Sequence, residues 1–87
     1  MSWEIQFSQK GVYEVMANCK PALGSEVLFS LKNQKIERVF EKDSTLGEYI
    51  VGDIVIDEIQ KMQSRFKVKN GEEFQFNKIL IRQKKGN

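Results

Sequence analysis

The sequence predicts a small all-β protein with mainly antiparallel strands. Short runs of alternating apolar and polar residues recur along the 87-residue chain, β-branched and aromatic residues enrich them, and Gly-marked turns separate them. Because closing a small sheet on itself removes its exposed edges, we expect an SH3-like or OB-like barrel of six to seven short strands. The alternative is an α+β fold in which one helix packs on a sheet.

The length fits one domain, because a core of this size cannot be divided further. We place that domain at residues 1–83 and expect a short basic tail at 84–87. Three strands are expected in its first half. Apolar and polar residues alternate over 3–7, "VYEVMA" at 12–17 forms the returning strand, and "EVLFSLK" follows the loop "NCKPALGS".

The second half begins with an ambiguous segment at 33–43. Ile36, Val39 and Phe40 have the spacing of one helix face, but the segment also fits an extended strand, which we favour. Residues 49–56, "YIVGDIVI", form the clearest strand, with Gly52 as a candidate bulge. We expect a short helical turn near 57–63 and a last strand around "ILI" at 79–81.

The stretch "RFKVKNGEEFQF" at 65–76 predicts a β-hairpin. A two-residue Asn-Gly turn would put its apolar residues on opposite faces. A three-residue loop with Gly71 in the left-handed conformation instead pairs Phe66 with Phe74 and Lys67 with Glu73. That register predicts Phe66, Val68 and Phe74 as core residues and Lys67 as half of a cross-strand ion pair.

The residue inventory argues against catalysis. The chain has no histidine, which is the commonest general base, and its one cysteine, Cys19, can form no intrachain disulfide. No cofactor or metal ligand set is recognisable, and we expect no enzyme activity. The N-terminal segment lacks the apolar core of a secretory signal, and no apolar run is long enough to span a membrane. These features predict a cytoplasmic protein without a membrane partner.

Positive charge is concentrated late in the chain. The net charge is +2, and the formal sums are 0 for residues 1–43, −4 for 44–58 and +6 for 59–87. Basic side chains that gathered on one surface would contact a nucleic-acid backbone without reading its sequence. This is the alternative functional hypothesis, a nucleic-acid-binding barrel, and its candidate residues are Lys61, Arg65, Lys78, Arg82, Lys84 and Lys85.

Surplus apolar residues support the leading hypothesis. The first three expected strands carry large apolar side chains on both faces, more than a thin barrel wall buries, so some apolar surface should remain outside. We therefore expect a non-enzymatic intracellular binding module, a small regulatory or accessory protein that acts through protein contact or self-association. Its candidate contact residues are Trp3, Val12, Met16 and Leu28.

Overall fold

The computed structural model describes residues 2–32, 34–71 and 73–84, with Trp3 described through its backbone alone. The described residues form seven strands and no helix, which confirms the all-β prediction and excludes the α+β alternative. The strands are β1 (Ser2–Gln6), β2 (Gly11–Lys20), β3 (Glu26–Leu31), β4 (Gln34–Val39), β5 (Gly47–Ile56), β6 (Lys61–Lys69) and β7 (Gln75–Gln83).

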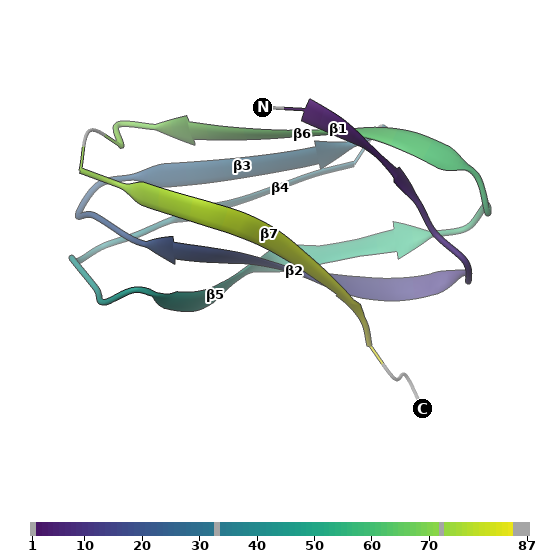
Figure 1. Ribbon diagram of the computed structural model, residues 1–87, viewed down its shortest axis with the longest axis horizontal. Coiled ribbons are helices and arrows are strands. Elements are labelled where there is room, and N and C mark those ends of the chain that lie inside the picture. The colour runs from purple at the N-terminus through teal and green to yellow at the C-terminus, as the bar shows by residue number, and fades with distance from the viewer. Residues whose placement is uncertain (1, 33, 72, 85–87) are drawn as a thin grey trace.

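The strands form two antiparallel sheets packed face to face (Figure 1). Sheet A has the order β1-β6-β3-β4, and sheet B has the order β5-β2-β7. Only β3 and β4 are neighbours both in sequence and in a sheet, so every other connection crosses between the sheets. No described strand pair joins the two sheets, so the described pairing does not close a barrel.

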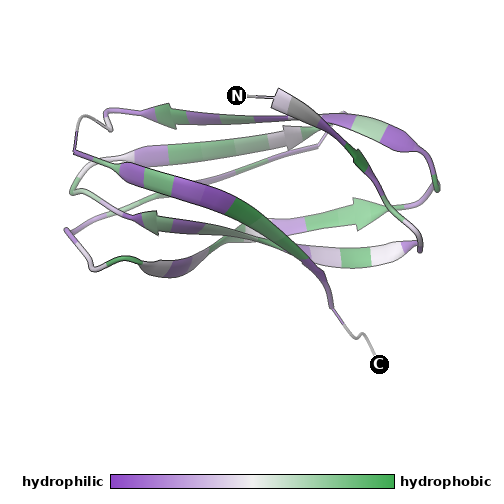
Figure 2. Ribbon diagram, viewed as in Figure 1, coloured by the Kyte–Doolittle hydropathy of each residue, from purple (hydrophilic) through white to green (hydrophobic). Residues whose placement is uncertain are grey.

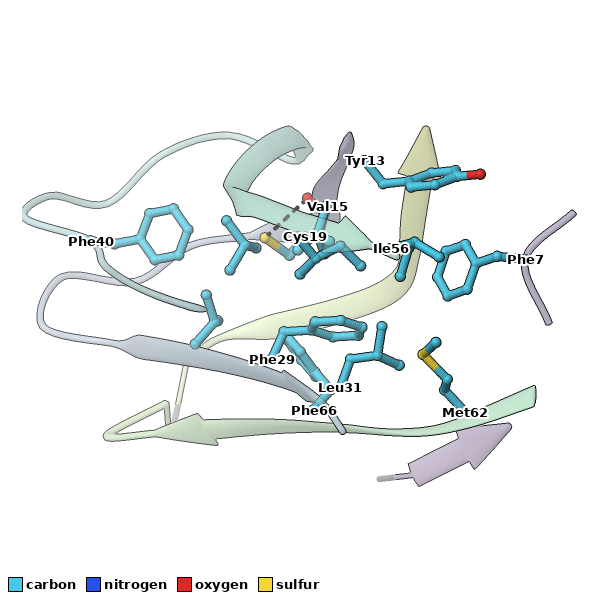
Figure 3. Packing of buried hydrophobic residues seen from close by; sticks show 14 residues of the cluster. Phe7, Tyr13, Val15, Cys19, Phe29, Leu31, Phe40, Ile56, Met62 and Phe66 are labelled. Atoms are coloured by element: carbon cyan, nitrogen blue, oxygen red, sulfur yellow. Dashed lines mark hydrogen bonds between the residues drawn. The ribbon is translucent and has the colours of Figure 1, made fainter. Parts of the chain in front are cut away.

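Hydrophobic and hydrophilic residues alternate along the strands (Figure 2). The core lies between the sheets, because each strand turns alternate side chains inward (Figure 3). Phe66 of sheet A stacks on Phe76 of sheet B, with ring centroids 4.6 Å apart. Each fully buried aromatic or aliphatic side chain contributes about 1.5–3 kcal/mol. The central inward residues are Tyr13, Val15, Ala17 and Cys19 of β2, Val27, Phe29 and Leu31 of β3, and Met62 and Phe66 of β6.

The predicted hairpin over 65–76 is wrong. Its two strands belong to different sheets, since β6 pairs with β1 and β3 while β7 pairs with β2. Phe66 is buried and lies opposite Phe29 in the register, so its assignment to the core is confirmed. The left-handed residue is Asn70, at φ 53°, and not Gly71.

Two further details of that prediction also fail. Lys67 lies opposite Leu28 of β3 and not opposite Glu73, because the chain leaves sheet A after β6. Val68 was expected in the core but is 36% exposed. Phe74, by contrast, is half-buried and packs against the core.

Side chains link the sheets where β4 lies beside β5. The amide of Gln34 donates to the carbonyl of Val55 at 2.6 Å and accepts from the Val55 N–H at 2.8 Å. Arg38 donates to the carbonyl of Ile50 at 2.8 Å. These bonds satisfy backbone groups on the outer edge of β5, so this edge is covered rather than left open.

Three predictions about the middle of the chain have clear outcomes. The extended interpretation of 33–43 is confirmed over Gln34–Val39 by β4, and residue 33 lies outside the described residues. The bulge at Gly52 is confirmed because Val15 pairs with Gly52 while Met16 pairs with Ile50. The helical turn near 57–63 is wrong. Ile59 is 54% exposed, and Lys61 already begins β6.

Candidate functional site

The two sheets separate the five predicted basic residues that the structure describes. Lys61 and Arg65 project from the outer face of sheet A, because Met62, Ser64 and Phe66 take the inward positions of β6. The basic residues near the end of the chain lie on sheet B instead. Lys78 and Arg82 belong to the outer face of β7, Lys84 directly follows that strand, and Lys85 lies outside the described residues.

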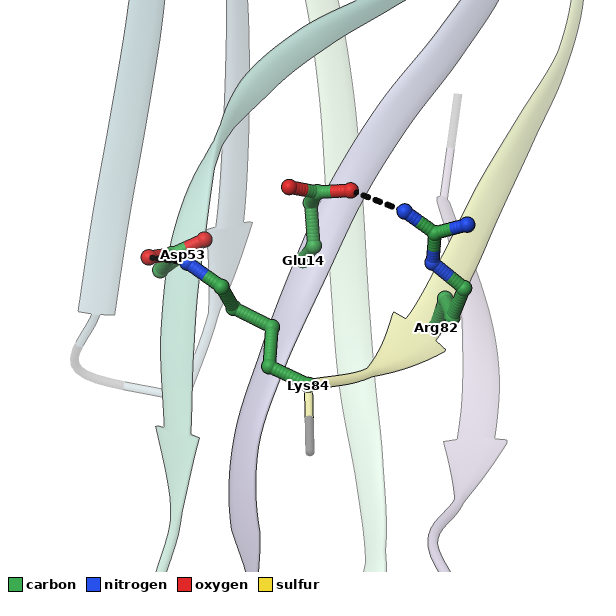
Figure 4. Close-up of polar contacts among 4 residues, drawn as sticks. All are labelled: Glu14, Asp53, Arg82 and Lys84. Atoms are coloured by element: carbon green, nitrogen blue, oxygen red, sulfur yellow. Dashed lines mark hydrogen bonds and ion pairs between the residues drawn. The ribbon is translucent and has the colours of Figure 1, made fainter. Parts of the chain in front are cut away.

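Two of those bases on sheet B are paired with acids (Figure 4). Arg82 lies opposite Glu14 in the register, and its guanidinium donates to the Glu14 carboxylate at 2.8 Å. The Lys84 ammonium lies 3.0 Å from the Asp53 carboxylate. The backbone N–H of Lys84 donates to the backbone carbonyl of Val12 at 2.8 Å. Lys84 is therefore tied to sheet B and is not part of a free tail. Pairing neutralises both bases, so neither offers an unpaired cation to a polyanion.

An apolar row crosses sheet B next to these ion pairs. Met16 of β2 lies opposite Leu80 of β7 on one side and Ile50 of β5 on the other. Ile50 is 49% exposed, and Met16 and Leu80 are half-buried. We call these three residues the apolar stripe. The apolar stripe is solvent-facing and spans the full width of the sheet. Met16 thus lies on an outer face, as the surplus of apolar residues in the sequence predicted.

The other predicted contact residues are placed separately. Val12 lies on the same outer face as Met16, beside the exposed Val55, on the far side of the row of ion pairs. Leu28 lies on the opposite side of the molecule, on the outer face of sheet A. The backbone of Trp3 pairs with Ser64 in sheet A, and its side chain lies outside the described residues. Among the three candidates whose side chains are described, only Val12 and Met16 therefore share a surface.

The outer face of sheet A is rich in basic side chains. Leu28 and Ser30 of β3 line a groove of about 260 Å³ on this face. Arg65 and Lys35 flank Ser30 in the register, and Lys67 flanks Leu28. We call the outward cations of β4 and β6 the basic face. Its members are Lys35, Lys61, Arg65, Lys67 and Lys69.

Sequence reasoning found only part of this face. It selected Lys61 and Arg65 but missed Lys35, which belongs to a segment with no net charge, and it assigned Lys67 to an ion pair. The alternation in "KMQSRFKVK" was the available signal, since it puts 61, 65, 67 and 69 on one side of a strand. Lys35 belongs to the basic face only because β4 pairs with β3, and no local sequence pattern predicts that pairing.

Cys19 is the remaining reactive group. It is buried in the core, and its thiol donates to the Ala17 carbonyl across 3.7 Å. Burial raises the pKa of the Cys19 thiol above its ordinary value, and Arg38 opposes that rise only in part. A buried neutral thiol is a poor nucleophile. Among residues 2–32, 34–71 and 73–84 no group of three or more Cys, Asp or Glu side chains is placed to hold a metal ion.

No helix long and apolar enough to cross a membrane is found in the described part of the chain. Comparisons with protein-family models, with curated proteins and with solved structures each found no match.

Proposed function

We propose that this protein is a non-enzymatic binding module that acts through protein contact, using the outer face of sheet B. The observation that carries the proposal is the apolar stripe, Met16, Ile50 and Leu80, which crosses all three strands without a charge between them. Apolar surface bordered by polar groups is typical of protein interfaces. The adjacent charged side chains already neutralise one another in ion pairs. A partner that covers this face therefore buries few charged groups that lack an ion pair.

The partner that this face fits is a second copy of the chain. Charge is divided across the outer face of sheet B, with the bases on β7 and the acids on β5. Lys78 and Glu48 end the same cross-strand row, on either side of Asn18, and neither makes an ion pair with another described residue. The face is thus positive along one edge and negative along the other.

A two-fold axis parallel to the strands brings these edges together. Rotation about an axis through Met16 places β7 of one copy over β5 of the other. Lys78 then faces Glu48 of the second copy, Leu80 faces Ile50, and Met16 faces itself. Such a self-complementary patch is the requirement for a closed, isologous dimer. We therefore propose self-association through sheet B as the primary activity of the module.

Sedimentation velocity over a dilution series tests this proposal. We expect the wild type to shift from monomer to dimer as concentration rises, and Met16→Glu to stay monomeric because it opposes two carboxylates in the centre of the contact. Ile59→Glu is the matched control, since it replaces an exposed apolar residue in the loop before β6 and should dimerise normally. Far-UV circular dichroism checks that each variant is folded.

A charge exchange tests the geometry of the contact. Lys78→Glu should weaken dimerisation, because it faces two acids toward each other, and adding Glu48→Lys should restore it. Each rim pair is worth about 0.2–1 kcal/mol, so the two symmetric pairs change the dissociation constant by about 2- to 30-fold. A wild type that stays monomeric at high concentration contradicts the proposal. A double variant no better than Lys78→Glu contradicts the two-fold arrangement.

A further inference from the structure

A row of hydrogen-bond donors crosses the whole of sheet A. Ser2 of β1, Arg65 of β6, Ser30 of β3 and Lys35 of β4 lie in one cross-strand register. Two hydroxyl groups, a guanidinium and an ammonium therefore face outward side by side, with no carboxylate among them. The guanidinium also presents a planar fork of donors, which suits the oxygens of a phosphate.

A second line of positive charge runs along β6 and crosses this row at Arg65. Outward positions of a strand recur every second residue, and residues 61 to 69 span about 26 Å. Lys69 is paired with Glu26 at 3.9 Å, whereas the other three cations on β6 make no ion pair with a described residue. Lys35 likewise makes no ion pair with a described residue. Three of these cations, Lys35, Arg65 and Lys67, line the groove over Leu28 and Ser30, and Lys61 continues the line along β6.

We propose that the basic face binds the phosphate backbone of a nucleic acid. The extended line of cations fits a polymer with evenly repeated charges, and the distance of about 20 Å from Lys61 to Lys67 matches the rise of roughly six nucleotides of a duplex strand at about 3.4 Å each. The described outward residues of sheet A include no aromatic side chain. Contact is therefore made with phosphates and not by base stacking, and affinity depends little on sequence.

Acidic residues mark the borders of the site. Glu37 of β4 lies opposite Leu28 and next to Lys35 on the same face, and Glu4 of β1 lies opposite Gln63. Both carboxylates repel phosphate at the margins of the groove, while Glu26 is engaged with Lys69. Neutralising Glu37 should therefore strengthen binding, which is the opposite of the effect expected for any cation of the face.

Fluorescence anisotropy with a labelled duplex of about 16 base pairs measures this binding. Each contacted phosphate contributes about 0.9 to the slope of log affinity against log salt. Four contacts give a slope of about −3.6, so affinity should fall roughly 150-fold between about 50 and 200 mM salt. Absence of binding at 50 mM salt overturns the proposal.

Charge-matched variants locate the site. Arg65→Gln/Lys67→Gln should reduce the slope to about −1.8, so that affinity falls only about 12-fold over the same salt range. Lys10→Gln/Lys20→Gln removes the same charge from exposed positions off this face, on the turn before β2 and at the end of that strand, and should retain the wild-type slope. Glu37→Gln should bind more tightly than wild type. Equal slopes for the two double variants contradict this location.

A competing polyanion identifies the class of ligand. An acidic peptide such as polyglutamate should compete only weakly with the duplex, because it lacks the tetrahedral phosphates that suit the donor row. Equal competition would show a surface for acidic proteins and overturn the assignment to nucleic acid. The site is independent of the proposed dimer, since it lies on the opposite sheet, and Met16→Glu should bind the duplex with an unchanged slope per chain.

Discussion

The two outer faces of the sandwich differ in what their cations meet across the strands. On sheet B, Arg82 lies 2.8 Å from Glu14 and Lys84 lies 3.0 Å from Asp53, so these charges are neutralised in ion pairs within the sheet. The apolar stripe is therefore the distinctive surface of sheet B. On sheet A, Arg65 meets serines on both sides, so its charge remains available. Cross-strand register, more than the charge of a segment, decides which face can bind which kind of partner.

The largest expected effect comes from the core that both faces share. Phe66 is 1% exposed, lies opposite Phe29 within sheet A and stacks on Phe76 of sheet B. Phe66→Ala should lower the free energy of unfolding by about 3–5 kcal/mol, because it removes buried surface and leaves a cavity between the sheets. Urea denaturation followed by circular dichroism measures the change.

Phe66→Ala is the reference for a loss of stability that affects both faces alike. Both dimerisation and duplex binding should weaken together in Phe66→Ala, whereas Met16→Glu and Arg65→Gln/Lys67→Gln each affect one activity. Gln63→Ala, at an exposed position of the same strand, should change stability by less than about 0.5 kcal/mol. A loss below 1 kcal/mol for Phe66→Ala would show that the sheets do not depend on this contact.

The connection from sheet A to sheet B should give the next largest effect. A Cβ atom at Gly71 would overlap Cγ1 of Val68 and lie 3.1 Å from Cβ of Phe74. Gly71→Ala should therefore destabilise the protein by about 1–3 kcal/mol, the usual cost of overpacking. The free energy of unfolding, measured in urea, checks this.

A double variant identifies the cause. Adding Val68→Ala removes the overlapping methyl groups, so Gly71→Ala should cost less in that background than in the wild type. Gly47→Ala is the control, because its Cβ would meet only the ring of Tyr49, at 3.6 Å or more. Equal costs of Gly71→Ala in the two backgrounds would argue that the backbone at Gly71, and not crowding, is responsible.

The connection also shows what the sequence can and cannot predict. Period-two alternation located the strands and put Phe66 in the core, because burial of one face is a local property of the pattern. The partner of a strand is not local. "RFKVKNGEEFQF" has every feature of a hairpin, yet β6 pairs with β1 and β3, whose residues lie far away in the chain. Both candidate surfaces depend on such pairings, so their members could be predicted only in part.

The smallest effect is expected from the ion pairs, and it compares the two faces directly. Glu14 has a side chain only 12% exposed and receives a 2.8 Å bond from Arg82, whereas Lys69 and Glu26 lie 3.9 Å apart and the Glu26 side chain is 25% exposed. Arg82→Ala should cost up to about 1 kcal/mol, because a nearly buried carboxylate loses its partner, and Lys69→Ala should cost less. Adding Glu14→Gln to Arg82→Ala should recover part of the loss by removing the unpaired charge. Urea unfolding of the three variants measures these differences, and equal costs at Arg82 and Lys69 would show that pairing across sheet B is no stronger than pairing across sheet A.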